Sequence, residues 1–121
     1  MDSLVDRNLP LTEVTYFVLL SLAGQPKHGY AIQKEVRVLS HGRVVLSTGT
    51  LYGALKRLLE QEWIERVDEL EPANEVRAET GRPRKAYTLT PLGHRILEAE
   101  LARLKSLVEA GQMRPAEELG V

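Results

Sequence analysis

The chain has 121 residues, 43% of them hydrophobic, which is enough for one domain with a core of its own. It contains no cysteine, and this excludes a disulfide framework, a thiol nucleophile and a zinc–thiolate site. The formal net charge of −1 excludes a uniformly basic protein, so any surface that binds nucleic acid must be local.

Residues 1–10 are expected to form a flexible N-terminal arm. A first helix is then predicted from about Pro10 to Ala23, where Gly24 and Pro26 end it. Its apolar residues go almost all the way round, and a helix that is apolar on every face is buried on every face. Because so short a chain can cover only one side of it, the other side needs a partner. The residues assigned to this contact are Val14, Phe17 and Val18.

A second helix is predicted from about His28 to Leu39, with its apolar residues turned toward the core. Tyr30 and Lys34 lie toward the opposite side and are expected to contact DNA. His28 is interpreted as a structural residue at the start of this helix, although a phosphate contact stays open. The run from Val44 to Leu46 is expected to pair with a later hairpin as a third strand.

A third helix begins near Ser47 and Thr48, whose side chains can cap its first turn. Four leucines recur on one side of it, at positions 51, 55, 58 and 59, and must face a core. The opposite side carries small residues that let a helix approach a DNA groove closely, together with one phenol and one amine. The residues of this helix assigned to DNA are Ser47, Thr48, Gly49, Thr50, Tyr52 and Lys56. An ordinary amphipathic helix with a solvated face is the open alternative.

Two β-capable runs follow, one after Trp63 and one at RKAYTLT, with a long polar loop between them. They predict a hairpin with a long tip. Near its second strand lie Arg82, Arg84 and Lys85, which are expected to enter a minor groove, where negative potential is concentrated. The acidic part of the loop, residues 68–79, is expected to point away from DNA. A solvated loop of similar composition is the alternative.

A last helix is predicted over residues 91–110, with Thr90 as its cap and Pro91 in its first position. A coiled-coil seam is formed by Leu97, Leu101, Leu104 and Val108. Two heptads are too few for an isolated coiled coil, so we expect the seam to cross a symmetry mate and the first helix of that mate. The alternative is a helix folded back on its own domain. Residues 111–121 are expected to be a frayed tail.

Catalysis is not expected. The three histidines lie in different elements with no spacing that would converge on a metal, and no glycine-rich loop leads from a strand into a helix. We therefore expect no enzyme activity, no cofactor and no metal. There is neither an N-terminal signal pattern nor an apolar stretch long enough to cross a bilayer, so a cytoplasmic protein without membrane contact is expected.

Three motifs in order resemble the PadR family of transcriptional regulators: HGYAI at 28–32, GTLY with ALKRL over 49–58, and RKAYTLTPLG at 84–93. The resemblance extends from about Leu11 to Leu97. It implies a homodimeric repressor that binds a palindromic operator through a recognition helix and a wing, often released by a small-molecule effector. Two positions depart from the family pattern. Gly53 stands where proline is usual, and Glu62 stands where glycine often ends the helix, which predicts strain or a different termination.

The expected fold is therefore mainly α with a small β-wing. It comprises a winged helix-turn-helix DNA-binding domain over residues 11–90 and a C-terminal dimerisation helix. The expected function is a homodimeric, sequence-specific DNA-binding transcriptional regulator of double-stranded operator DNA. A small apolar or aromatic effector could sit between the C-terminal helices. The alternative is a dimeric winged-helix module that binds proteins and not DNA.

Overall fold

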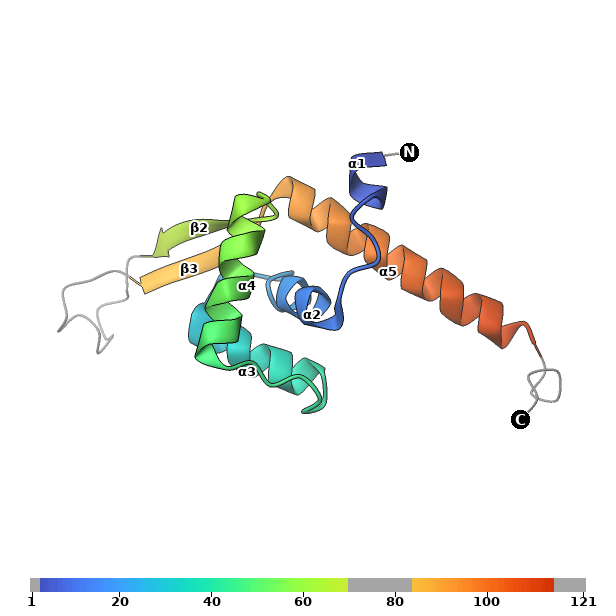
Figure 1. Ribbon diagram of the computed structural model, residues 1–121, viewed down its shortest axis with the longest axis horizontal. Helices are drawn as coiled ribbons and strands as arrows, with labels where there is room; N and C mark the ends of the chain where they lie inside the picture. Colours follow the sequence, from blue (N-terminus) through green and yellow to red (C-terminus); the bar gives the residue numbers. More distant parts are fainter. Residues whose placement is uncertain (1–2, 70–83, 115–121) are drawn as a thin grey trace.

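The computed structural model describes residues 3–69 and 84–114. Five helices and three strands follow in chain order within these ranges: α1 (Ser3–Asp6), α2 (Glu13–Ser21), β1 (Lys27–His28), α3 (Gly29–Leu39), α4 (Thr48–Glu60), β2 (Ile64–Glu69), β3 (Arg84–Leu89) and α5 (Pro91–Gln112). The fold is mainly helical with a small antiparallel sheet, as expected. In Figure 1, β2 and β3 project from one end of the molecule and the C-terminal half of α5 from the other.

The core forms around α2, which packs against both α3 and α5. Val18 and Leu19 of α2 are completely buried, and they are joined by Ile32 and Val36 from α3. The leucines of α4 join the same core, with α4 lying across α2 and α3 and its end beside the start of α5 (Figure 1). Apolar residues at helical spacing therefore predicted the buried faces of α3 and α4 correctly.

The sheet has the strand order β1-β3-β2, with β3 in the middle. Ile64 of β2 pairs with Leu89 of β3, and Lys27 of β1 pairs with Tyr87. The expected hairpin is thus present, but the expected third strand at residues 44–46 is wrong: that segment has no strand structure, and residues 27–28 take the place beside β3. Lys27 and His28 lead directly into α3, so their pairing joins the wing to the helical layer.

The N-terminal segment also differs from the prediction of a flexible arm. Residues 3–6 form α1, which packs against α5, and Val5 is buried in the core. The single turn of helix places one apolar side chain against the core while its neighbours stay in solvent. Two adjacent apolar residues, Leu4 and Val5, among polar ones carry too little periodicity to predict which of them is buried.

The end of α4 shows how the chain tolerates Glu62. The backbone of Glu62 has φ 63°, in the left-handed region that glycine favours. The amide of Glu62 donates to the carbonyl of Leu59 at 3.0 Å, and the amide of Trp63 donates to that of Leu58 at 3.0 Å. This is the Schellman pattern that usually ends on glycine. The strain expected at Glu62 is therefore present. Upstream, α4 runs through Gly53 without interruption.

A buried carboxylate attaches the middle of α5 to the rest of the domain. Glu100 is 2% exposed, and its Oε2 accepts a hydrogen bond from the amide of Leu11 at 3.1 Å, just before α2. Arg103 donates to both carboxylate oxygens, at 2.6 and 2.9 Å. The Arg103 hydrogen bonds hold the pKa of Glu100 below its ordinary value; burial opposes this shift, and the Leu11 amide adds to it.

We expect Glu62→Gly to stabilise the protein by about 1 kcal/mol, because glycine removes the steric cost of the left-handed conformation. Chemical denaturation would show this as a higher midpoint with an unchanged slope. The matched control is Glu60→Gly two residues earlier, within the regular helix, which should destabilise by up to about 1 kcal/mol. A loss of stability in both variants would contradict the strain at position 62.

We expect Glu100→Gln to lower the free energy of unfolding by roughly 1–3 kcal/mol at pH 7, since the charged acceptor of two Arg103 bonds is lost. The pKa of Glu100 is lowered by folding, so its contribution is present above the unfolded value of about 4.3 and disappears as the pH falls through the folded pKa. Wild-type and variant stabilities should therefore converge in acid. Glu98→Gln, on an exposed position of the same helix, is the control and should change stability by less than about 0.5 kcal/mol.

Candidate nucleic-acid interface

Two features position the exposed face of α4: a side-chain cap at the start of the helix and a row of leucines buried on the opposite side. Ser47 Oγ accepts from the amide of Thr50 at 3.1 Å and thereby fixes the first turn. Leu51, Leu55 and Leu58 are at most 3% exposed. The residues of this helix and its cap that the sequence assigned to DNA are all turned to solvent: Ser47, Thr48, Gly49, Thr50, Tyr52 and Lys56. Arg57 and Glu60, nearer the end of α4, are exposed as well. A flat, mostly small surface with hydroxyl donors and one amine suits entry into a major groove.

Tyr52 is held in place by the start of α3. Its hydroxyl lies so close to the α-carbon of Gly29 that any β-carbon there would collide with it. Glycine at this position therefore lets α4 and α3 approach each other. Tyr52 remains 47% exposed, so one side of its ring is available to a ligand. Near it lies Tyr87 of β3, whose pKa is raised by burial and by the neighbouring Tyr52, against a lowering effect of Arg66.

Beside α4, the solvent face of α3 adds a second set of polar groups. Tyr30 is 72% exposed and Lys34 is also exposed, as the sequence predicted for both. A groove of about 250 Å³ runs between α3 and the loop before α4 and is lined by Tyr30, Gln33, Lys34, Arg37, Val45 and Leu46. Gln33 Nε2 donates to the carbonyl of Leu46 at 2.6 Å and ties this loop to α3.

The sheet brings one further basic residue toward these helices. Lys85 of β3 is exposed, and its carbonyl lies 3.2 Å from Nδ1 of His28, the residue before α3. This hydrogen bond agrees with the structural interpretation of His28. Arg84 is the first residue of β3. Arg82 and most of the acidic loop segment lie outside the described residues.

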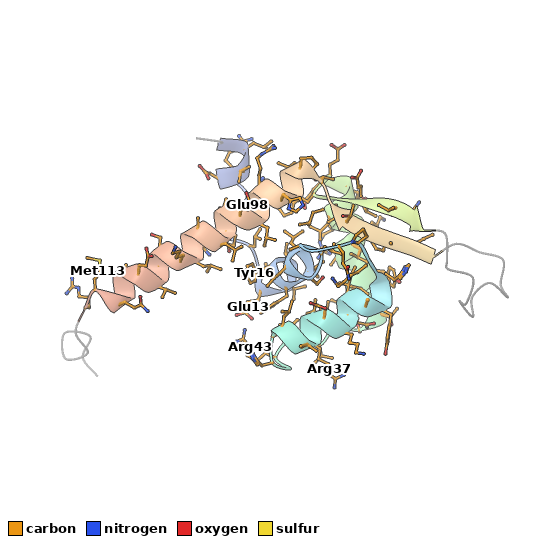
Figure 2. The ribbon with its side chains drawn as sticks, turned by 180° about the vertical axis from the view of Figure 1, so that it is seen from behind. Glu13, Tyr16, Arg37, Arg43, Glu98 and Met113 are labelled. Atoms are coloured by element: carbon orange, nitrogen blue, oxygen red, sulfur yellow. The ribbon has the colours of Figure 1, made fainter. Side chains whose placement is uncertain are left out.

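Sequence reasoning assigned no DNA contact to Gln33, Arg37 or Val45, although it placed Arg37 on the same side of its helix as Tyr30 and Lys34. Arg37 lies one turn after Lys34 on the same side of α3, and Figure 2 shows it pointing away from α2 and α5. Its spacing from Tyr30 and Lys34 was the available signal. Gln33 and Val45 had no such signal, because their roles depend on how the loop before α4 packs against α3.

The proposed dimer contacts are only partly accessible. Val18 is completely buried and Leu97 is 4% exposed, both within the core of their own chain, so their assignment to a dimer interface is wrong. Each faces the side of its helix that meets its own domain. Val14, Phe17 and Leu104 are partly exposed, and Leu101 and Val108 are exposed at 41% and 57%. Leu107, also 57% exposed, was missed because it lies outside the strict heptad seam.

The helix that carries this exposed face, α4, is joined directly to α5 at its C-terminal end. Thr90 Oγ1 donates to the carbonyl of Glu62 at 2.6 Å, and the Thr90 amide donates to the carbonyl of Trp63 at 3.0 Å. Thr90 is also the cap of α5, accepting from the amide of Gly93 at 3.0 Å. A β-carbon on Gly93 would collide with the Trp63 carbonyl. The start of α5 is therefore packed backbone to backbone on the end of α4.

No cluster of three or more histidine or acidic side chains able to hold a metal ion occurs in residues 3–69 and 84–114. No helix in this same part of the chain is long and apolar enough to span a membrane. The described surface thus offers a polar, partly basic face on α3, α4 and β3 as its candidate site.

Several solved structures share this fold. A PadR family transcription regulator from Clostridium difficile is 24% identical, covers 84% of this chain and 97% of its own, and has a TM-score of 0.66. A PadR-like transcription factor from Bacteroides fragilis is 28% identical, with coverages of 83% and 87% and a TM-score of 0.63. PadR of Bacillus subtilis in complex with operator DNA is 22% identical, with coverages of 76% and 48% and a TM-score of 0.59.

A curated relative is similar in sequence. An uncharacterized 37.1 kDa protein in a transposon of Streptomyces fradiae is 38% identical over 94 residues, which are 75% of this chain and 24% of that protein. The chain thus spans about a quarter of the length of this relative.

The family itself is shown by a match over most of the chain. Residues 18–99 match the family described as Transcriptional regulator PadR-like, and this range contains α3, α4, the hairpin strands and the first half of α5. Its members are transcriptional regulators and not enzymes, which agrees with the sequence-based expectation. With the winged-helix arrangement and the exposed face of α4, this match establishes that the chain belongs to the PadR-like family of transcriptional regulators.

Proposed function

We propose that this protein is a homodimeric repressor that binds a palindromic operator in double-stranded DNA. The observation that carries the proposal is the exposed face of α4, where small and hydroxyl side chains surround Tyr52 and Lys56 while the leucines lie buried behind. Lys34 and Lys85 flank this face from α3 and β3. Cations on both sides of a slim helix suit phosphates on both sides of a major groove.

The similarity in fold to Bacillus subtilis PadR, whose structure was solved with operator DNA, supports this assignment. In the proposed complex, Ser47, Thr48, Gly49, Thr50, Tyr52 and Lys56 approach the groove, and Tyr30, Lys34, Arg84 and Lys85 contact the backbone. Arg82 extends the basic end of the wing. A repressor of this kind acts by occupying its operator and excluding polymerase, which requires no catalytic group.

The second copy is proposed to cover the apolar surface that α5 leaves exposed. The C-terminal half of α5 extends beyond the other helices (Figure 1). It presents Leu101, Leu107 and Val108 to solvent at 41–57% exposure. On the neighbouring α2, Phe17 is partly exposed and packs edge-on against Tyr16, with ring centroids 5.4 Å apart. Together these side chains form an apolar strip that a crossing α5 and its α2 would bury.

A twofold dimer of this kind would hold two α4 helices about one DNA turn apart, roughly 34 Å. The space between crossing α5 helices is the proposed place for a small apolar or aromatic effector, which would act by changing that separation. A thermal-shift screen tests the effector: a compound that both raises the melting temperature and alters operator binding supports it. Compounds that do neither count against an inducible switch.

The rival function is a protein-interaction module, and salt dependence separates the two. We expect binding to a selected duplex to weaken by about 0.9 log units per log unit of salt for each neutralised phosphate. Lys56→Ala and Lys85→Ala should each lower that slope by about 1.8 per dimer, because every contact occurs twice. Lys105→Ala, on the projecting part of α5, is the matched control and should leave the slope unchanged. Affinity that is flat with salt would exclude the DNA-binding function and favour the rival.

We expect Leu107→Glu to dissociate the dimer, because a carboxylate placed in an apolar contact loses its solvation. Analytical ultracentrifugation should show a monomer, while circular dichroism should retain the helical content, since Leu107 is mostly exposed in its own chain. Ser106→Glu adds the same charge one residue away, on the outer side of the seam, and should leave the dimer intact. A Leu107→Glu protein that remains dimeric would contradict the proposed interface.

A further inference from the structure

Val45 is an exposed apolar residue in the basic part of the candidate interface. Its side chain is 63% exposed, whereas that of the next residue, Leu46, is 5% exposed. Isolated exposed valines are common on protein surfaces. This one lines the same groove as Lys34 and Arg37, two residues before the cap of α4. Its position in the candidate interface, and not its exposure alone, therefore indicates a candidate contact with DNA.

The backbone on both sides of Val45 is anchored. The amide of Val44 donates to Ser40 Oγ at 2.9 Å, and Ser40 is buried at the end of α3. The carbonyl of Leu46 accepts from Gln33 Nε2 at 2.6 Å. Ser47 then begins the cap of α4. A β-branched side chain held between three such anchors is a rigid apolar knob, with one preferred rotamer and little entropy to lose on contact.

The groups around the knob match the chemistry of a DNA groove. Tyr30, Lys34 and Arg37 follow one another along the solvent face of α3, at spacings of four and three residues. The basic pair suits phosphates along one strand. With this pair on the phosphates and α4 in the major groove, Val45, which precedes the cap of α4 by two residues, would face the base edges. Among those edges, the 5-methyl group of thymine is the apolar one exposed in the major groove.

We propose that Val45 is a specificity-determining residue that packs against the 5-methyl group of one thymine in each operator half-site. Lys34 and Arg37 hold the neighbouring phosphates. This inference rests on the proposed function and deepens it: α4 reads donors and acceptors, while the preceding loop reads a methyl group.

Deoxyuridine scanning tests the inference on the full-length protein. An operator is first selected from a random DNA pool, and its thymines are then replaced one at a time by deoxyuridine, which lacks only the methyl group. At one thymine per half-site, we expect wild-type affinity to fall about four-fold, as the burial of one methyl group implies. The Val45→Ala variant should bind the original operator more weakly and should no longer distinguish thymine from deoxyuridine at that position.

Two controls make the outcomes distinct. Val38→Ala truncates a valine of similar exposure, 66%, that does not line the groove, and it should change neither affinity nor discrimination. Thermal melting verifies that both variants fold, as expected for exposed positions. If wild type selects no DNA, the proposed function itself fails. If it binds its operator but every deoxyuridine substitution affects wild type and Val45→Ala equally, DNA binding stands and the methyl contact is overturned.

Discussion

The face of α4 that is proposed to bind DNA connects to α5, which is proposed to form the dimer, through a short contact between the end of α4 and the start of α5. Thr90 donates to the carbonyls of both Glu62 and Trp63, and Gly93 leaves no space above the Trp63 carbonyl. The Thr90 amide bond to Trp63 and the close approach of Gly93 to the same carbonyl join backbone to backbone and leave little freedom of movement, while the bond to Glu62 uses the Thr90 hydroxyl. The left-handed residue at 62 is what turns the chain sharply enough to make the joint.

In the proposed dimer, the rigid contact between α4 and α5 would couple the position of α5 to that of α4. The recognition face and the apolar strip on α5 lie on opposite sides of this contact, and Glu100 fixes the next part of α5 to the segment before α2. A change in how two α5 helices cross would therefore move each α4 as a body. Because half-site spacing is set by the DNA helix, even a small rotation at the dimer axis alters the fit of both faces at once.

Local charge resolves the apparent conflict between a net charge of −1 and DNA binding. The described cations at the interface gather on α3, α4 and β3, where Lys34, Arg37, Lys56 and Lys85 are exposed. On α5, exposed charges of both signs occur, with Glu98 and Glu109 alongside Arg95 and Lys105. A local group of cations can attract a phosphate backbone even when the net charge of the whole chain is close to zero.

The sequence by itself determined the elements whose signals are local. Leucine and valine periodicity predicted α3 and α4, Ser47 and Thr90 marked two helix starts, and three ordered motifs indicated the family. Only the tertiary structure decided which apolar residues face inward: it buried Val18 of α2 and Leu97 of α5 in their own chain and left Leu107 exposed. It also decided that residues 27–28, and not 44–46, pair with β3, and that Val5, and not its neighbour Leu4, is buried against the core. Periodicity is a property of one segment, whereas strand pairing, close approaches at glycine and the choice of a buried face depend on what another segment presents in space.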